Sequence, residues 1–225
     1  PLFAHWTFDG QFGTACKDSS GNGRDAEPQA GRPVGFTRMG GLFGGGLSFS
    51  GNHRLSTSGE GQFDEIRKIS FSAWVMPRGW DHYNEIFRKE DGTNRVLFSF
   101  QNEGSILSLG LNIDGYVECD AKIDPAALLD GGWHHAAATF DGRLMQVYLD
   151  GREVGALERP GAIAAGGTAV GCIGSSNGGE CFVGNIDDVR IYEDGLTADE
   201  VALLYRNGQE ALAALLRDLR VGDQA

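Results

Sequence analysis

The segment GNIDDVRIYEDGLTADEVALLY, residues 184–205, changes from the pattern of a strand to the pattern of a helix. Its first half alternates apolar and polar residues around Asp187 and Asp188, which is typical of a β-strand. Strict alternation places Asp188 on the side of Ile186 and Arg190, and Asp187 on the opposite side. One of the two carboxylates is therefore expected to point into the interior, where a charge without a partner is costly.

The second half of this segment predicts a short amphipathic helix. Thr197 and Glu200 have the spacing of a capping box, in which each side chain binds the backbone N–H of the other residue. Gly208 stands where a glycine commonly ends a helix. The residues after it have a second helical pattern. We therefore expect one domain over residues 1–207 and a helical tail, or the start of a linker, over 208–225.

Short strands are predicted over most of the chain before this segment. The protein has 225 residues, and its 35 glycines separate apolar or alternating runs of strand length. Three of the clearest runs are KISFSAWVMP (68–77), RVLFSFQN (95–102) and ILSLGLNI (106–113). About eleven such runs, with almost no helix between them, predict an all-β fold of two antiparallel sheets packed as a sandwich.

The charge of the chain limits the partners that it can have. The formal net charge is −12, from 31 acidic residues and 19 Lys and Arg. Nucleic acid and anionic membrane surfaces need a basic face, so neither is an expected partner. No apolar run approaches the roughly 20 residues of a membrane-spanning helix, so we expect no membrane insertion. The chain opens on PLFAHWTFDG without a signal peptide, which we interpret as a mature chain or a fragment.

The four cysteines do not have the spacing of a zinc ribbon or a CxxC redox site. Cys172 and Cys181 flank IGSSNGGE, which has the composition of a hairpin loop, and we predict a disulfide between them if the strand geometry allows it. The sequence does not indicate disulfide partners for Cys16 and Cys119. The alternative for both residues is a free, buried thiol. A disulfide would indicate a compartment outside the cytoplasm.

Seven stretches of the sequence resemble, in this order, the LamG-like jelly-roll domain of the concanavalin A-like lectin/glucanase superfamily, a laminin G or pentraxin-like fold. They are AHWTFDG, DSSGNGRDAEP, GGGLSFSG, ISFSAWVMP, GWHHAAATFDG, VYLDGREV and FVGNIDDVRIYEDGLTADEVALLY, and the resemblance covers nearly all of residues 3–207. It implies two curved sheets in a jelly roll and a mostly non-catalytic module of an extracellular enzyme or surface protein. We therefore expect an extracytoplasmic binding module, part of a larger multidomain chain, with a glycan or protein ligand.

The polar loop KDSSGNGRD (17–25) is a candidate calcium site. Calcium binds six to eight oxygen atoms from carboxylates and carbonyls, often in a flexible loop, and Asp18 and Asn22 offer such oxygens. Many members of the family bind a structural calcium ion. The resemblance implies that this loop meets the strand of the IDD motif, so that Asp188 closes the site.

The alternative to a metal site is an aspartate at a strand end that accepts backbone N–H groups or pairs with Arg190. The family more often has Asp where this chain has Ser50, which weakens the calcium interpretation slightly. Weaker additional candidates for the metal site are Asp9, Gly51 and Asn52.

The segment RGWDHYNEIFRKEDGTNR (78–95) is a candidate for ligand binding. Sugars are held by aromatic rings that stack on their C–H surface and by planar polar side chains that bind their hydroxyl groups, and loops often carry such sites. The candidate residues are Trp80, His82, Tyr83, Asn84 and Arg88. The alternative is that Trp80 and Tyr83 cover the rim of the sandwich core.

No catalytic site is predicted. Glucanases of this superfamily carry Glu-x-Asp-x-x-Glu on one strand, and the sequence has no such spacing. Retaining glycosidases need two carboxyl groups about 5–5.5 Å apart, whereas adjacent residues of a strand point to opposite faces. Because neighbouring side chains of a strand point to opposite faces, His134 and His135 are not expected to share a metal ion. The sequence also has no GxSxG nucleophile motif. We therefore expect no enzymatic activity.

Overall fold

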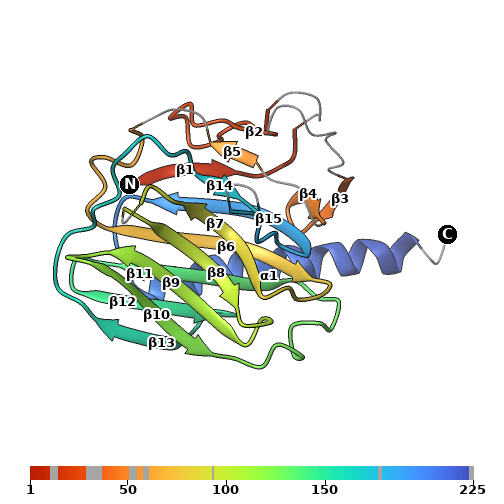
Figure 1. Ribbon diagram of the computed structural model, residues 1–225. Coiled ribbons are helices and arrows are strands. Elements are labelled where there is room, and N and C mark those ends of the chain that lie inside the picture. The colour runs from red at the N-terminus through yellow and green to blue at the C-terminus, as the bar shows by residue number, and fades with distance from the viewer. Residues whose placement is uncertain are drawn as a thin grey trace.

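The computed structural model describes residues 1–10, 15–28, 37–50, 55–57, 61–92, 94–176 and 179–222. Its strands form two antiparallel sheets that pack face to face, and one helix lies on the outside of the sandwich (Figure 1). The predicted all-β jelly-roll sandwich with a C-terminal helical segment is confirmed.

Sheet A contains the last long strand of the chain, which carries Asp187 and Asp188. Its strands are β1 (Leu2–Trp6), β3 (Thr37–Gly41), β4 (Gly44–Phe49), β6 (Ile69–Pro77), β11 (His134–Phe140), β12 (Leu144–Leu149), β13 (Arg152–Glu158) and β15 (Gly184–Tyr192). Their order is β13-β12-β11-β6-β15-β4-β3, and β1 pairs with β15. The first and last strands of the chain are therefore neighbours.

Sheet B contains the middle of the chain. Its strands are β2 (Ala26–Pro28), β5 (Leu55–Thr57), β7 (Tyr83–Lys89), β8 (Val96–Gln101), β9 (Ile106–Asn112), β10 (Tyr116–Lys122) and β14 (Cys172–Ile173). Their order is β10-β9-β8-β7-β14-β5-β2. The four long strands β7 to β10 are consecutive in the chain, so the main part of this sheet is a meander.

The core lies between the two sheets and is built from alternate residues of the strands. Phe71 of β6 stacks on Phe98 of β8 at 5.6 Å between ring centroids, and it lies 5.2 Å from the ring of Phe87 on β7. All three side chains are almost completely buried. Because the core uses only every second residue of each strand, the outer face of each sheet is formed by a separate set of side chains.

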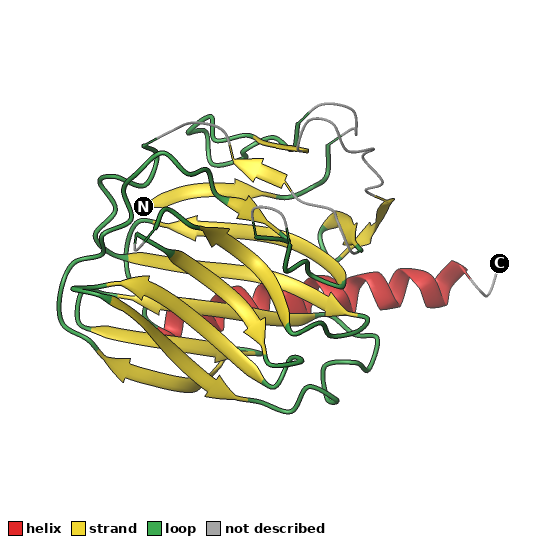
Figure 2. Ribbon diagram, viewed as in Figure 1, coloured by secondary structure: helices red, strands yellow, loops and turns green. Residues whose placement is uncertain are grey.

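The helix α1 (Ala198–Gly222) packs on the outer face of sheet A, behind the sandwich in the view of Figure 2. Thr197 and Glu200 form the predicted capping box: Glu200 Oε2 accepts the backbone N–H of Thr197 at 2.8 Å, and Thr197 Oγ1 accepts that of Glu200 at 3.3 Å. Tyr205 of α1 stacks on Trp74 of β6 at 5.9 Å. No helix within the described residues has the length and apolar character needed to span a membrane.

The predicted end of the helix at Gly208 is wrong, because α1 continues through this residue to Gly222. A Cβ atom at Gly208 would lie only 1.9 Å from Cζ2 of Trp74. The glycine is therefore needed for close contact between helix and sheet. Ala211 and Leu212, one turn further along, pack on the cluster that contains Trp74, so the helix contacts sheet A on both sides of Gly208.

Asp187 and Asp188 lie on the same face of β15, which corrects the expectation from strict alternation. Asp188 has a φ angle of 50°, and the pairing of β15 with β6 shifts between Asp187 and Arg190. This is a β-bulge, which inserts one residue and changes the direction of the side chains that follow. Ile186 and Val189, on either side of the pair, both point into the core. Both carboxylates are therefore on the outer face of sheet A.

Candidate functional site

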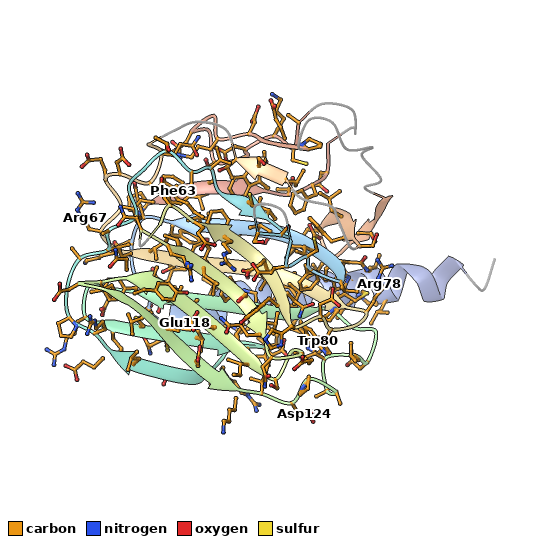
Figure 3. All side chains as sticks on the ribbon, in the orientation of Figure 1. Phe63, Arg67, Arg78, Trp80, Glu118 and Asp124 are labelled. Atoms are coloured by element: carbon orange, nitrogen blue, oxygen red, sulfur yellow. The ribbon has the colours of Figure 1, made fainter. Side chains whose placement is uncertain are left out.

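Trp80, the first residue of the predicted ligand site, covers one end of the core. Its ring lies 5.2 Å from that of Phe100, and its Nε1–H donates to the backbone carbonyl of Pro125 at 3.1 Å. A Cβ atom at Gly104 would lie 2.3 Å from the indole ring, so the glycine makes room for it. Figure 3 shows Trp80 at the end of sheet B. These contacts agree with the structural interpretation of Trp80 that the sequence left open.

Of the other four predicted ligand residues, three are divided between this end and the outer face of sheet B. His82 is exposed and contacts Glu103 through Nδ1 at 3.0 Å. Tyr83 begins β7, and its ring meets that of His82 edge-on at 4.4 Å. The pairing of β7 with β8 shifts between residues 85 and 87. This bulge places Arg88 on the same outer face as Tyr83. The fifth candidate, Asn84, is buried and binds the backbone of Asp81.

Four polar residues form a row across the outer face of sheet B. Glu85 of β7 pairs with Ser99 of β8, Ser99 pairs with Ser108 of β9, and Ser108 pairs with Asp120 of β10. Residues next to Ser99 and Ser108 in their strands point into the core, so this row faces outward. Ser108 Oγ donates to Asp120 Oδ1 at 2.6 Å. Although the row faces outward, three of its residues are almost completely buried: Glu85, Ser99 and Ser108.

Tyr116 provides an aromatic surface beside this row. Its hydroxyl group donates to Glu118 Oε1 at 2.7 Å, and the guanidinium carbon of Arg95 lies 4.8 Å from the centre of its ring. A Cβ atom at Gly110 would lie 2.2 Å from the Tyr116 hydroxyl, so the glycine of β9 lets the tyrosine lie close against the sheet. Gln101 also donates to Glu118, at 3.3 Å. Figure 3 shows Glu118 on the face of sheet B that is turned toward the viewer.

Arg88 is the centre of an ion cluster on the same face. Its NH1 group donates to Glu85 Oε1 and to Glu180 Oε2, both at 2.7 Å, and its Nε–H donates to Glu90 Oε2 at 2.8 Å. Arg95 also pairs with Glu90. The side chain of Glu85 is completely buried, whereas those of Glu90 and Glu180 are 35% and 34% exposed. We call these five residues the Arg88 cluster.

Three buried polar atoms of this face have no hydrogen-bond partner among the described residues: Glu85 Oε2, Ser99 Oγ and Arg95 Nε. Burial raises the pKa of Glu85 to about 8, although Arg88 acts in the opposite direction. A buried polar atom left without a partner costs about 1–3 kcal/mol, and such atoms often mark places where water or a ligand binds. The outer face of sheet B is therefore the best candidate for a binding site in the described structure.

Tyr83 and Arg88, two of the residues that the sequence suggested for ligand binding, lie near this face, whereas Glu85, Ser99 and Tyr116 were not among the candidates. A signal was present, because polar or small residues alternate with apolar ones at Ser99 and Gln101 of VLFSFQ and at Ser108, Gly110 and Asn112 of ILSLGLN. Such a pattern predicts a strand with a polar outer face. The sequence contained no sign that this outer face would be buried.

Asp18 of the predicted calcium site accepts hydrogen bonds from its own loop and from β1. Its Oδ1 atom accepts the backbone N–H groups of His5 and Ser20 at 3.0 and 2.9 Å. Its Oδ2 atom accepts the Ser20 hydroxyl at 2.8 Å and the backbone N–H of Arg24 at 2.9 Å. Burial alone would raise the pKa of Asp18, but these donors outweigh it and lower the pKa.

Asn22 and Asp188 are also held by ordinary donors and acceptors. The Asn22 amide donates to two backbone carbonyl groups of β1 at 2.9 and 3.1 Å. Asp188 Oδ1 contacts His5 Nε2 at 2.6 Å and accepts from Arg190 NH2 at 3.1 Å. Asp18 and Asp188 therefore meet at His5, one at its backbone and one at its ring, and the loop is tied to β15 through this residue.

This donor set does not fit a calcium ion. The oxygens of Asp18 already accept four hydrogen bonds, and a guanidinium group lies next to Asp188, where a second cation would be repelled. Within the described part of the chain, no group of three or more His, Cys, Asp or Glu side chains is placed to hold a metal. Asp9 accepts the backbone N–H of Gly45 at 2.6 Å, whereas Gly51 and Asn52 lie outside the described residues. The calcium ion stays a prediction from the sequence.

The structure does not contain the predicted disulfide between Cys172 and Cys181, because all four cysteines are thiols. The loop folds back on itself, with Phe182 N–H donating to the carbonyl of Gly174 at 2.9 Å and Ser176 N–H to that of Gly179 at 3.2 Å, but its two ends do not join neighbouring strands of one sheet. Cys172 lies in β14 of sheet B, between β7 and β5, whereas the chain after Cys181 enters β15 of sheet A. The loop thus crosses between the sheets, and Cys181 Sγ contacts Ser175 Oγ at 3.5 Å.

Solved structures with this fold include several binding domains. Domain 4 of AbnA, a GH43 extracellular arabinanase from Geobacillus stearothermophilus, was solved in complex with arabinotriose; it has a TM-score of 0.73 and 22% identity, over 91% of this chain and 98% of that one. The CBM40 domain of the Ruminococcus gnavus IT-sialidase, bound to α2,3 sialyllactose, has a TM-score of 0.59 and 12% identity, over 71% and 96%.

A third similar structure is the binding domain of botulinum neurotoxin DC in complex with rat synaptotagmin II. It has a TM-score of 0.59 and 13% identity, and the match covers 92% of this chain and 51% of that one. A family model described as the concanavalin A-like lectin/glucanases superfamily matches residues 49–202. This match confirms the resemblance seen in the sequence motifs: the chain belongs to the concanavalin A-like lectin/glucanase superfamily.

Proposed function

We propose that this protein is a non-catalytic binding module that recognises carbohydrate on the outer face of sheet B. The observation that carries the proposal is the set of buried polar atoms at Glu85, Ser99 and Arg95 that have no partner in the described part of the chain, beside the half-buried ring of Tyr116. A sugar offers hydroxyl groups, which both donate and accept hydrogen bonds, and an apolar C–H surface that packs on an aromatic ring.

The similar structures support a ligand of this class. The arabinanase domain was solved with arabinotriose and the sialidase domain with sialyllactose, both of them oligosaccharides. The identities of 22% and 12% relate the folds but do not carry over individual contacts. We therefore take from them only the class of ligand, and take the place of the site from the residues of this chain.

The Arg88 cluster supports a binding role rather than hydrolysis. A glycosidase places its two carboxyl groups on either side of the bond that it cleaves, with the sugar between them. Here Arg88 NH1 lies between Glu85 and Glu180 and donates to both. Its guanidinium group takes the position that a scissile bond would need, so these two acids are unsuited to act as an acid and nucleophile pair.

A position outside the cytoplasm and a role within a larger chain are part of the proposal. The similar arabinanase is an extracellular enzyme, and its domain 4 is one part of that chain. The toxin domain similar to this chain was solved with a protein, synaptotagmin II. A protein ligand on the same fold is therefore the second candidate function.

Binding to sugars tests the proposal directly. Affinity electrophoresis in gels that contain arabinan, galactan or xylan, followed by calorimetry with arabinotriose, should show binding by the wild-type protein. Tyr116→Ala and Ser99→Ala should each weaken it by about tenfold or more, since each removes a contact worth about 1–2 kcal/mol. His82→Ala, at the exposed end of the sheet, serves as the matched control and should bind like the wild type.

Three results would contradict the proposal. Retention of full affinity by Tyr116→Ala and Ser99→Ala would move the site away from this face. Release of reducing ends from any of these polysaccharides would identify an enzyme. Failure to bind any glycan, with the fold intact by circular dichroism, would favour the protein ligand.

A further inference from the structure

The charges of the Arg88 cluster do not balance if all five groups are ionised. Glu85, Glu90 and Glu180 provide three carboxylates, whereas Arg88 and Arg95 provide two guanidinium groups. Glu90 contacts both arginines, and Glu180 contacts Arg88. One negative charge is left over, and a single proton on one carboxylate would make the cluster neutral.

Glu85 is the carboxylate best placed to hold that proton. Its side chain is completely buried, whereas those of Glu90 and Glu180 are about one third exposed to water. Its Oε1 atom accepts from Arg88, and its Oε2 atom has no partner among the described residues. Burying an uncompensated charge is far more costly than burying a neutral acid. In agreement with this, burial raises the pKa of Glu85 to about 8.

Glu85 faces a second atom that lacks a partner. Ser99 is its cross-strand neighbour on β8, and Ser99 Oγ is buried without a hydrogen bond to the described residues. Side chains that pair in this way start from Cβ atoms about 4.5–5.5 Å apart. A carboxylic acid and a serine hydroxyl both donate and accept hydrogen bonds, so a third hydroxyl between them can satisfy both.

We propose that Glu85 is a neutral carboxylic acid that binds, together with Ser99, a hydroxyl group of an uncharged sugar. The inference rests on the proposed function and specifies the ligand class of that same site. The side chains of Glu90 and Glu180 are about one third exposed, and the sugar reaches the buried Glu85 Oε2 and Ser99 Oγ atoms when the side chains that cover them move aside.

The other charges on this face favour the same ligand class. Within the described residues, Glu85 is faced by Arg88 of its own strand, by Glu90 just after that strand, by Arg95 before β8 and by Glu180 before β15. Glu118 and Asp120 of β10 add two more carboxylates to the face. An acidic sugar would bring a further negative charge to a surface where carboxylates outnumber arginines, so neutral glycans are selected.

The protonation of Glu85 is measured first, without any ligand. Infrared difference spectra between about pH 6 and pH 10 should show loss of the carbonyl band of a protonated acid in the wild-type protein. The band should be weaker in Glu85→Gln, which keeps the shape of the side chain but cannot ionise; the part that stays comes from Asp187, whose pKa burial raises to about 7. Glu158→Gln, on the exposed edge strand β13, is the matched control and should lose the same band as the wild type. An equal band in the wild type and in Glu85→Gln at pH 6 would overturn the inference and leave the proposed function standing.

Binding of arabinotriose as a function of pH is measured second. The affinity of the wild type should fall about tenfold between pH 6 and pH 9, because the protonated fraction of an acid with a pKa of about 8 falls about tenfold by one unit above it. Glu85→Gln should bind at both pH values with little change, and Ser99→Ala should bind weakly at both. Sialyllactose, which carries a carboxylate, should bind at least about tenfold more weakly than arabinotriose.

The outcomes separate the two proposals. Binding of arabinotriose that does not change with pH and that survives Glu85→Ala would overturn the role of Glu85 but not the carbohydrate site. Tighter binding of sialyllactose than of arabinotriose would overturn the selection for uncharged sugars. Lack of binding to arabinotriose and to the neutral polysaccharides at every pH would overturn both proposals.

Discussion

The carboxylate of Asp187 on β15 accepts a 2.7 Å hydrogen bond from the backbone N–H of Leu42, in the turn between β3 and β4. The same oxygen accepts the N–H of Phe43 at 3.1 Å, and the other oxygen accepts the N–H of Asp188 at 2.7 Å. Burial raises the pKa of Asp187 to about 7, while these donors act in the opposite direction. The adjacent aspartates thus have separate structural roles: Asp187 holds the β3–β4 turn, and Asp188 holds β1 through His5.

Replacement of Asp187 should therefore destabilise the fold strongly. Asp187→Ala leaves three backbone N–H groups without acceptors, and we expect a loss of about 3 kcal/mol or more in the free energy of unfolding. Asp187→Asn keeps one carbonyl oxygen for Leu42 and Phe43 and should lose less. Urea denaturation at neutral pH measures both. Equal stability of Asp187→Ala and the wild type would show that these hydrogen bonds are not formed.

Gly208→Ala should destabilise the protein although alanine is the better helix former. Replacing glycine by alanine inside an exposed helix stabilises it by about 1 kcal/mol. Here the added methyl group would overlap the Trp74 ring, so we expect a net loss of about 1–3 kcal/mol. Asn207→Ala, at the exposed neighbouring position, is the control and should be neutral or slightly stabilising. A stabilised Gly208→Ala variant would contradict the packing of α1 on sheet A.

His135 should make the stability depend on acid pH. Its ring is fully buried, bonds Ser72 Oγ through Nε2 at 2.9 Å and lies 5.1 Å from the ring of Trp74. Burial lowers its pKa from 6.5 to about 4. The unfolded chain therefore binds a proton at this residue at higher pH than the folded protein does. The contribution of the neutral His135 ring to the free energy of unfolding is therefore fully present above about pH 6.5. It is lost as the pH falls to about 4, and the loss amounts to at most about 3 kcal/mol.

Denaturation at pH 7 and at pH 4.5 tests this role of His135. His135→Gln cannot be protonated, so its stability should fall less than that of the wild type over this range, although other acid groups contribute equally to both. His82→Gln removes an exposed histidine and should behave like the wild type. The same decline in wild type and His135→Gln would rule out a contribution from the buried imidazole.

Chelation tests the calcium ion predicted from the sequence. Because the oxygens of Asp18 and Asp188 are paired with protein donors, we expect excess EDTA to leave the midpoint of thermal unfolding unchanged. A bound ion at one hundred times its dissociation constant would add about 2.7 kcal/mol. A midpoint that rises with added calcium and falls with EDTA would restore the predicted site and require Asp18 to exchange its partners.

The sequence predicted those features of the fold that depend on local pattern. Alternating runs such as ISFSAWVMP became strands, and the spacing of Thr197 and Glu200 gave the capping box. The bulge at Asp188 could not be predicted in this way, because an aspartate with a positive φ angle does not change the alternation of apolar and polar residues in the sequence. The role of Gly208 depends on its contact with Trp74, which is distant in sequence.

The candidate site was only partly predictable for a similar reason. Tyr83 and Arg88 were identified because aromatic and planar polar residues cluster in one segment. The contact between Arg88 and Glu180 joins residues 92 positions apart, and the buried Glu85 contacts the same guanidinium group. No local pattern contains such information, so the sequence indicated only the segment 78–95, whereas the polar atoms without partners among the described residues also lie on β8 and next to it.

Mapping of a bound sugar onto the protein tests the central claim most directly. Titration of isotope-labelled protein with arabinotriose, followed by amide chemical shifts in NMR spectra, reports which strands the ligand contacts. The account predicts that the largest shifts occur in β7, β8, β9 and β10, around Glu85, Ser99 and Tyr116. Shifts confined to sheet A or to the loop around Asp18, or no shifts at millimolar sugar, would contradict a carbohydrate site on the outer face of sheet B.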